Sequence, residues 1–361
     1  GISGFHPLIP DTSPPYQTET FHLPLECIPK VMVATYLTLH SLPKTSSCPY
    51  NCVMKIYDSL TNLPASTKGA VIAIGNFDGV HQGHRALLTE ARRIATGKDL
   101  ALGVLTFEPH PRKLFRPDDP PFRITPPSMK YGLLADCGAD FIVSLPFDWT
   151  FASQSAEDFV QNILLDCLSP THIVIGFDFR FGQLRKGDAE TVQSAGIDVT
   201  AFPAALSPEG DKYSSTAIRQ HLRSGDIAAA NSMLGWGWEW EMEGPIFRGD
   251  RRGHDLGYPT ANVLLGDTLH PAYGVYATLV RIEGETEWRM AATNIGIRPM
   301  FEVKTGQIEA HILDFEDRDI NGRILRVRAI KRLRGEAKFA SLEELVAQIE
   351  DDCAQTRQIL S

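Results

Sequence analysis

The chain has 361 residues, of which 43% are hydrophobic and 22% are charged, and its formal net charge is −9. This length predicts two domains of ordinary size, and the composition is typical of a globular protein. The negative charge argues against a nucleic-acid binder held by phosphate contacts, so we expect no nucleic-acid partner. Because no apolar run approaches the roughly 20 residues that span a bilayer, we also expect no membrane partner.

Residues 1–53 differ in composition from the rest of the chain. They hold eight prolines and no arginine, and their apolar residues follow neither the period of a strand nor that of a helix. We therefore predict a disordered tail, and neither a secretory nor a mitochondrial signal, since both would need basic residues. The six cysteines are scattered without the spacing of metal ligands, which favours a reducing, cytoplasmic compartment.

From residue 70 onward the chain alternates short apolar runs with helical patterns. Strands are expected at 70–74, 100–107, 140–145 and 172–177, and residues 86–95 carry apolar residues at helical spacing. This alternation predicts an α/β domain with a Rossmann-like parallel sheet wound by right-handed crossovers. Ligands bind such sheets at the carboxyl ends of the strands.

A different pattern begins after the segment GWGWEWEMEGP. Residues 243–334 alternate polar and apolar side chains in short runs, which predicts a small antiparallel β-barrel. The chain then ends in an expected helix, in which Ser341 and Glu344 form a capping box. Apolar residues from Leu342 to Cys353 are expected to line one face of this helix.

The decapeptide GNFDGVHQGH, residues 75–84, joins the first expected strand to the first expected helix. Free N–H groups and the helix dipole make such a junction an anion site, and Gly75 and Gly83 allow a phosphate to approach the backbone closely. His81 and His84 add donors that can stabilise charge during substitution at phosphorus. The absence of a GK[ST] ending excludes a Walker loop. The alternative is a glycine turn with incidental histidines.

The decapeptide matches the HxGH signature of the nucleotidylyltransferase superfamily. It resembles the form found in bifunctional riboflavin kinase/FMN adenylyltransferases, the prokaryotic FAD synthetases. Two further segments are similar to motifs of this family, GFDFRFGQLRKGD at 176–188 and YSSTAIR at 213–219. The resemblance extends from about Met54 to Leu360.

This resemblance implies roles for individual residues of the first domain. His81 and His84 would be catalytic contacts to the phosphates of ATP, and Asp178 would lie in the flavin- and nucleotide-binding region. The ordinary alternatives are a loop-turn role for Asp178, an N-cap role for Ser215 and Thr216, and a surface position for Arg219. Nucleotide or flavin contacts are implied at Gly75, Phe77, Asp78 and Gly83, and closure over the triphosphate at Ser215, Thr216 and Arg219.

The segment RGDRRGHDLGYPTAN, residues 248–262, is rich in glycine and arginine, which suits a loop that grips phosphate and runs into a strand. Gly253 and Gly257 are its expected cofactor-binding glycines. Thr260 and Asn262 are two residues apart, so their side chains share a face of the strand. Their neutral oxygens suit Mg²⁺ bound alongside ATP. From composition alone, an arginine-rich solvated loop is the favoured interpretation.

The resemblance reverses that preference, because PTAN is the mark of the riboflavin kinase module. The segments NIGIRPMF at 294–301 and IEAHILDF at 308–315 fall where other motifs of that module are expected. Glu309 matches the family's catalytic glutamate, which would accept the proton of the ribityl 5′-hydroxyl as that oxygen attacks the γ-phosphate. The alternative for Glu309 is an outward strand carboxylate.

The chain departs from the family pattern at two places. Met300 stands where the family often has Thr, and DINGR at 319–323 replaces a DLYG-type turn. Both departures concern the expected flavin contacts and leave the phosphate chemistry untouched. The basic segment RVRAIKRLR, residues 326–334, is interpreted as a solvated barrel face and not as a nucleic-acid site, given the net charge.

These motifs predict an α/β nucleotidylyltransferase domain at 54–238, followed by a β-barrel riboflavin kinase domain with a C-terminal helix at 239–361. The enzyme would phosphorylate riboflavin to FMN and adenylylate FMN to FAD, with Mg²⁺ as cofactor and ATP as co-substrate. Riboflavin, FMN, FAD and ATP are the expected ligands, and a monomer or weak homo-oligomer is the expected state. Two alternatives stay open: a nucleotidylyltransferase for another phosphorylated small molecule, and a flavin-binding protein without turnover.

Overall fold

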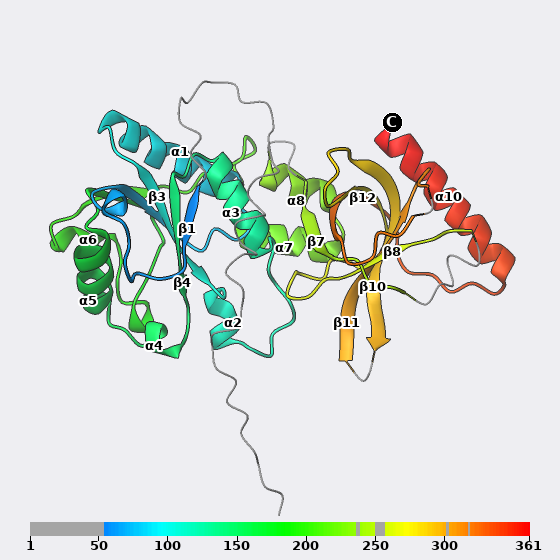
Figure 1. Ribbon diagram of the computed structural model, residues 1–361, viewed down its shortest axis with the longest axis horizontal. Helices are drawn as coiled ribbons and strands as arrows, with labels where there is room; N and C mark the ends of the chain where they lie inside the picture. Colours follow the sequence, from blue (N-terminus) through cyan, green and yellow to red (C-terminus); the bar gives the residue numbers. More distant parts are fainter. Residues whose placement is uncertain (1–53, 236–238, 250–256, 301–302, 317) are drawn as a thin grey trace, which may run out of the picture. The chain divides into compact units, whose positions relative to one another are not determined.

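The computed structural model describes two six-stranded sheets, one parallel and one antiparallel (Figure 1). The predicted tail at 1–53 and the predicted site residue Gly253 lie outside the described residues. No helix of the described part of the chain is both long and apolar enough to cross a bilayer. The described residues are 54–235, 239–249, 257–300, 303–316 and 318–361.

The first sheet has the order β1-β4-β3-β2-β5-β6, and all neighbouring strands run parallel. The four predicted strands are confirmed as β2 to β5. The sequence does not predict the edge strands, because β1 has three residues and β6 is half-exposed without a regular alternation. The strands are β1 (Lys55–Tyr57), β2 (Val71–Ile74), β3 (Leu102–Glu108), β4 (Phe141–Pro146), β5 (His172–Gly176) and β6 (Asp198–Phe202).

Helices connect these strands and pack against the sheet (Figure 1). The predicted helix at 86–95 is the centre of α1 (Gln82–Gly97), which contacts β2, β3 and β5. The other helices of this half are η1 (Ala65–Thr67), α2 (Pro111–Phe115), α3 (Pro127–Asp136), α4 (Trp149–Ala152), α5 (Ala156–Asp158), the π-helix η2 (Phe159–Leu168), η3 (Gln183–Arg185), α6 (Ala189–Ser194), α7 (Ser215–Ser224) and α8 (Ile227–Leu234).

The strand order places the decapeptide at the reversal point of the sheet. From β2 the chain builds outward through β3 and β4 on one side and through β5 and β6 on the other. The carboxyl end of β2 is therefore the topological switch point, the usual ligand site of an open parallel sheet. All four residues of β2 are buried, so core packing fixes the strand that leads into Gly75.

The second sheet has the order β7-β12-β9-β10-β11-β8 and is antiparallel throughout. Its edge strands approach each other where Phe247 N donates to Asn262 O at 2.9 Å, so the sheet is nearly closed. This confirms the barrel predicted at 243–334. The strands are β7 (Glu241–Pro245), β8 (Ala261–Leu264), β9 (Gly274–Ile282), β10 (Arg289–Met300), β11 (Val303–Ile312) and β12 (Ile324–Arg334).

The predicted C-terminal helix is confirmed as α10 (Leu342–Leu360), which packs on β9 and β10. The Ser341 hydroxyl accepts from Glu344 N at 3.2 Å, as predicted. The Glu344 carboxylate accepts from Ala340 N and not from Ser341, so half of the predicted capping box is wrong. Cys353 is buried while Leu342 is exposed, because only the later turns of the helix cover the barrel.

We expect Gly274→Ala to destabilise the barrel. Gly274 begins β9 with a φ of 147°, and a Cβ there would overlap the carbonyl oxygen of Arg334 on β12. Forced overpacking typically costs about 1–3 kcal/mol, and urea unfolding measures the loss. The matched control is Gly284→Ala, which has a φ of 81° but open space around the new Cβ. Equal losses in both variants would show that backbone strain alone sets the cost.

Candidate functional site

The loop between β2 and α1 has a strained backbone around Asp78. Phe77 and Val80 have φ values of 51° and 38°, and Gly79 has a φ of 89°. Positive φ is costly for bulky residues, and most costly for a β-branched residue such as Val80. The surrounding structure must therefore impose this conformation, as is typical of functional loops.

Asp78 is buried at the centre of a hydrogen-bonded network. Its carboxylate accepts from the main-chain N–H groups of Ile124 and Thr125 at 3.0 and 3.1 Å, and from Arg219 Nη2 at 2.6 Å. The Ser215 hydroxyl donates to the main-chain oxygen of Asp78 at 2.8 Å. The structure thus brings two predicted site residues, Ser215 and Arg219, into contact with a third, Asp78.

His81 and His84 form a stacked pair at the N-terminus of α1. The Nδ1 atom of His81 accepts from His84 N at 3.3 Å, and the two ring centroids lie 3.7 Å apart. A Cβ at Gly83 would lie only 3.0 Å from the His81 ring, so the glycine between the histidines gives this ring room to fold back over the helix end. Phe77 packs edge-on against His84 at 5.3 Å.

Burial keeps both imidazoles neutral at neutral pH. It lowers the pKa of His81 to about 4, and it lowers the pKa of His84 well below the ordinary value of 6.5. The positive charge of Arg219 adds to the effect on both rings. Because His81 Nδ1 is an acceptor, its proton lies on Nε2, which leaves an N–H donor for an anion. His84 Nδ1 is buried without a hydrogen-bond partner among the described residues.

The other predicted residues of this site lie nearer the surface. Gly75 directly follows β2, and Thr216 is exposed in the first turn of α7. Asp178 is exposed just beyond the end of β5, where its carboxylate pairs with Lys212 Nζ at 2.8 Å. Lys212 was not predicted as a site residue, since a lone surface lysine belongs to no sequence pattern.

Exposed aromatic side chains that were not predicted from the sequence follow β4 and β3 on one side of β2 and β5 on the other. Phe115, Trp149 and Phe177 come after β3, β4 and β5 and are 55%, 64% and 49% exposed. Phe115 packs edge-on against Trp149 with ring centroids 5.7 Å apart. Exposed aromatic faces are suited to binding planar ligands. The available signal is the concentration of Phe and Trp directly beyond the predicted strands.

Strands β8 and β11 bring the predicted residues of the second site together. Asn262 and Glu309 are direct partners in the antiparallel register. Asn262 Nδ2 donates to Thr260 O at 3.1 Å and lies 3.5 Å from Thr260 Oγ1, so these two residues are in contact as their spacing predicts. Gly257 is exposed, with a φ of 84° and open space around its Cα.

Gln307 links Asn262 on β8 with Glu309 on β11. Its buried side chain donates from Nε2 to Asn262 Oδ1 at 2.8 Å and to Glu309 Oε1 at 3.1 Å. Its Oε1 is buried without a hydrogen-bond partner among the described residues. An unpaired buried acceptor costs free energy, which is typical of a place where a ligand supplies the donor. The sequence signal for Gln307 is its position two residues before Glu309, on the same strand face.

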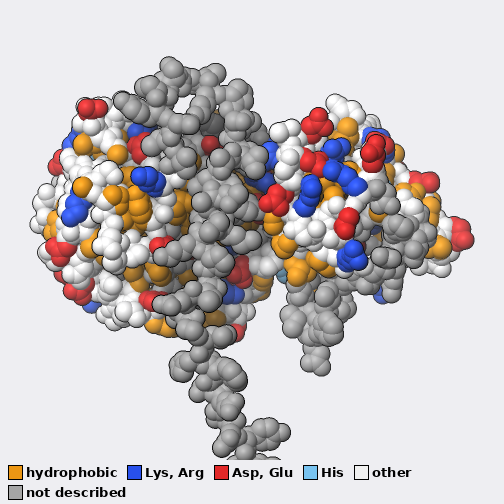
Figure 2. Space-filling view, in the orientation of Figure 1, with side chains coloured by type: hydrophobic (Ala, Val, Ile, Leu, Met, Phe, Trp, Pro, Cys, Tyr) orange, Lys and Arg blue, Asp and Glu red, His pale blue; other side chains and the backbone are white. Residues whose placement is uncertain are grey.

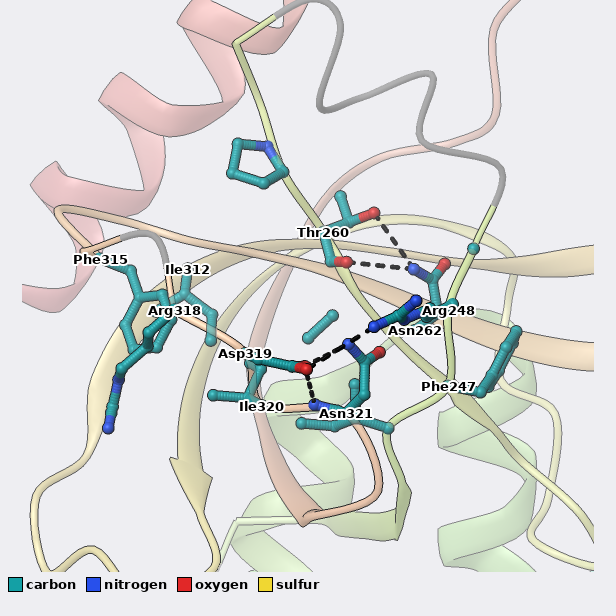
Figure 3. A pocket seen from close by; sticks show the side chains of 14 residues that line it. Phe247, Arg248, Thr260, Asn262, Ile312, Phe315, Arg318, Asp319, Ile320 and Asn321 are labelled. Atoms are coloured by element: carbon teal, nitrogen blue, oxygen red, sulfur yellow. Dashed lines mark hydrogen bonds and ion pairs between the residues drawn. The ribbon is translucent and has the colours of Figure 1, made fainter.

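A pocket of about 500 Å³ opens beside Thr260 and Asn262 (Figure 3). Asp319 and Asn321 line it too, and the departure from the family pattern at 319–323 therefore lies beside the expected phosphate site. Glu309 is not among the described lining residues. The lining consists of Ile246, Phe247, Arg248, Gly249, Pro259, Thr260, Ala261, Asn262, Ile312, Phe315, Arg318, Asp319, Ile320 and Asn321.

The expectation of a solvated basic face on the barrel is wrong for Arg326 and Arg328. Both are about one-fifth exposed, and they pair with the buried carboxylate of Glu241 on β7 at N–O distances of 2.5 and 2.6 Å. The Arg328 guanidinium also lies 4.2 Å from the ring centroid of Trp288. Lys or Arg side chains and Asp or Glu side chains are intermixed on the visible face of the barrel (Figure 2).

The two sheets and their sites define a two-domain, ATP-dependent transferase. Residues 63–217 match the family described as FAD synthetase, and residues 236–360 match the family described as riboflavin kinase. A bifunctional riboflavin kinase/FMN adenylyltransferase of Escherichia coli (strain K12) is 39% identical over 84% of this chain and 97% of its own length. The relative of that name from Bacillus subtilis (strain 168) is 35% identical over 78% of this chain and 90% of its own.

One solved structure is similar along most of the chain. It is described as a macrolide-efflux protein from Streptococcus pneumoniae, and it is 30% identical with a TM-score of 0.74, over 84% of this chain and 98% of that one. The chain belongs to the family of bifunctional riboflavin kinase/FMN adenylyltransferases.

We expect the free energy of unfolding to fall as the pH is lowered from 6.5 toward 4. In this window His81 is protonated in the unfolded chain but still neutral in the folded one, so protons favour unfolding; below about pH 4 the effect saturates. His81→Asn keeps a side-chain oxygen that can cap α1 but removes this titration. Urea unfolding of the variant should depend less on pH, by roughly 1–3 kcal/mol across the window. Parallel curves for variant and wild type would contradict this assignment.

Proposed function

We propose that this chain phosphorylates riboflavin with ATP to give FMN and ADP in the barrel half. It then adenylylates FMN with ATP on the parallel-sheet half, giving FAD and pyrophosphate. The observation that carries the proposal is that each half holds its own assembled site. One is the neutral histidine pair on the N-terminus of α1, and the other is the Asn262–Gln307–Glu309 cluster.

In the adenylylation, a phosphate oxygen of FMN attacks the α-phosphorus of ATP and pyrophosphate leaves. The attacking phosphate carries no proton that must be removed, so the site needs donors and alignment and no general base. His81 Nε2–H and the His84 ring supply donors at the point where free N–H groups of α1 also point outward. Neutral donors avoid placing two stacked cations 3.7 Å apart.

We assign the flavin ring of FMN to the exposed aromatic side chains at the ends of β3, β4 and β5. Phe115, Trp149 and Phe177 offer apolar faces at the same edge of the sheet as the decapeptide. Lys212 lies 5.0 Å from the Phe177 ring centroid and is paired with Asp178, so a positive charge borders this face. That arrangement suits an aromatic ring attached to a phosphate.

In the kinase reaction, Glu309 accepts the proton of the ribityl hydroxyl while the hydroxyl oxygen attacks the γ-phosphorus of ATP and ADP leaves. Gln307 holds the Glu309 carboxylate through the 3.1 Å hydrogen bond and leaves its own Oε1 free to accept from a substrate hydroxyl. The adjoining pocket has apolar walls, including Phe247 and Phe315, that suit the adenine ring of ATP.

The oxygen ligands at Thr260 and Asn262 fit Mg²⁺. A hydroxyl and an amide oxygen are hard, neutral donors, and both residues line the pocket assigned to ATP. When bound, the ion would offset the negative charge of the ATP phosphates. Thr260 and Asn262 would hold it, and Gln307 would orient the Asn262 amide through the 2.8 Å hydrogen bond.

The domain limits at 54–238 and 239–361, the cytoplasmic location and the monomeric or weakly associated state stay predictions.

The function itself is tested by chromatography of riboflavin, FMN and FAD after incubation of the protein with riboflavin, ATP and Mg²⁺. Sequential appearance of FMN and FAD is expected. Flavin that is bound but unchanged would instead support a non-catalytic flavin-binding protein.

His84→Ala should abolish FAD formation while riboflavin is still phosphorylated. Removal of one preorganised donor typically costs about 10²–10³ in rate. The matched control is His172→Ala, since His172 is also partly buried but lies at the amino end of β5, away from the switch point. Steady-state rates on riboflavin and on FMN decide the matter, and equal damage to both reactions would refute a role specific to adenylylation.

Glu309→Gln should lower riboflavin phosphorylation by about 10²–10⁴, the usual contribution of a general base. FMN added from outside should still become FAD at the wild-type rate, because the histidine pair is unchanged. Glu283→Gln, at an exposed carboxylate next to the end of β9, is the matched control. If riboflavin turnover in Glu309→Gln stays within a few-fold of wild type, the base lies elsewhere.

A further inference from the structure

Segment 122–125, between α2 and α3, is hydrogen-bonded along its main chain to both halves of the molecule. On the nucleotide-binding side, the Asp78 carboxylate accepts from the N–H groups of Ile124 and Thr125. Arg219, which pairs with Asp78, donates from Nε to Phe122 O at 2.8 Å. The segment therefore belongs to the network that holds the decapeptide loop.

The barrel side supplies two further donors to the same segment. Leu269 N donates to Arg123 O at 2.8 Å, and the indole Nε1 of Trp240 donates to Ile124 O at 3.0 Å. Trp240 is 1% exposed, and its main-chain N–H donates to Asn231 Oδ1 at 2.8 Å. Ala329 N on β12 donates to Trp240 O at 3.0 Å, so the barrel holds the main chain that carries the indole.

Side chains of segment 122–125 add further contacts to the two halves. Ile124 is fully buried in a cluster that also contains Trp240 and Met242 of the barrel half. On its other side Ile124 packs against the decapeptide loop, since a Cβ at Gly79 would lie 3.3 Å from it. Arg123 forms a two-pronged pair with Glu108 at the end of β3, at 3.0 and 2.8 Å.

We propose that Trp240, a residue of the kinase half, is a positioning residue for the adenylylation site. The inference rests on the function proposed for that site. Trp240 acts through Ile124 and Asp78, which together hold the loop that carries His81 and His84. The barrel is therefore part of the scaffold of the nucleotide-binding site.

The connection between the indole and the loop rests on the need of buried polar groups for hydrogen-bond partners. Ile124 O is buried and has the indole as its donor, so without the indole the carbonyl must move toward another donor or toward water. Any such movement carries the adjoining N–H groups away from the Asp78 carboxylate. The loop next to Asp78 has positive φ at Phe77 and Val80, a conformation that persists only while its surroundings impose it.

The test is Trp240→Phe in the full-length chain, which keeps an aromatic ring but removes the donor. We expect kcat for adenylylation of added FMN to fall about 10- to 100-fold, because small displacements of catalytic groups have effects of that size. KM for FMN should change less than about three-fold, since the proposed flavin face is elsewhere. Phosphorylation of riboflavin by the same preparation should stay within two-fold of wild type.

A second readout does not depend on activity. Hydrogen exchange of the amides of Ile124 and Thr125 should become at least about ten-fold faster in Trp240→Phe, because both amides donate to Asp78. If wild-type protein did not adenylylate FMN, the proposed function would fail, and the exchange rates alone would decide the positioning role. Unchanged exchange in a folded variant would overturn it.

The matched control is Tyr276→Phe, which also removes one buried donor from a fully buried aromatic residue of the same cluster, where the hydroxyl donates to Ala272 O. A selective adenylylation defect of equal size in this control, equal loss of both reactions in Trp240→Phe, or a change confined to KM would each overturn the proposal. If Trp240→Phe does not fold, Asn231→Ala removes the acceptor of the Trp240 main-chain N–H and is judged by the same criteria.

Discussion

The buried carboxylate of Asp78 is the constraint on which the nucleotide-binding end of the molecule depends. A buried ion without partners costs several kcal/mol, so the fold must supply donors to it. Arg219 supplies one at 2.6 Å, and the 122–125 segment supplies two main-chain N–H groups. Because these donors come from separate parts of the chain, one carboxylate fixes the decapeptide loop, segment 122–125 and α7 relative to each other. The strained φ values on either side of Asp78 follow from this arrangement.

The two proposed sites would bind the phosphates of ATP in different ways. At the histidine pair, burial lowers the pKa of both rings, so the site offers neutral N–H donors at a helix N-terminus. In the barrel, strand register places Asn262 opposite Glu309, so the proposed site would offer an amide oxygen and a carboxylate to its substrates. The first arrangement suits a nucleophile that is already ionised. The second suits a hydroxyl nucleophile, which must lose a proton.

Local patterns allowed the sequence to predict much of this structure. Four buried strands, α1, the barrel and α10 follow from hydrophobic periodicity, and the contact of Thr260 with Asn262 follows from their spacing. The role of Asp78 as a structural centre could not be predicted, because its partner Arg219 lies 141 positions away. The pairing of Glu241 with two arginines of β12 depends in the same way on which strands are neighbours. Edge strands such as β6 lack a buried face, so they leave no periodic signal.

The contacts between the halves make their dependence on each other unequal. The relative positions of Asn262 and Glu309 are set by main-chain pairing of β8 with β11, entirely within the barrel. The positions of His81 and His84 depend on a loop held through Asp78, and two of the donors to Asp78 lie on segment 122–125, which is bonded to Trp240. We therefore expect a disturbed junction between the halves to displace the proposed adenylylation site through segment 122–125, whereas the proposed kinase site keeps its register. The geometry of the proposed adenylylation site, which would act second, thus depends on the barrel half, whose proposed kinase site would act first.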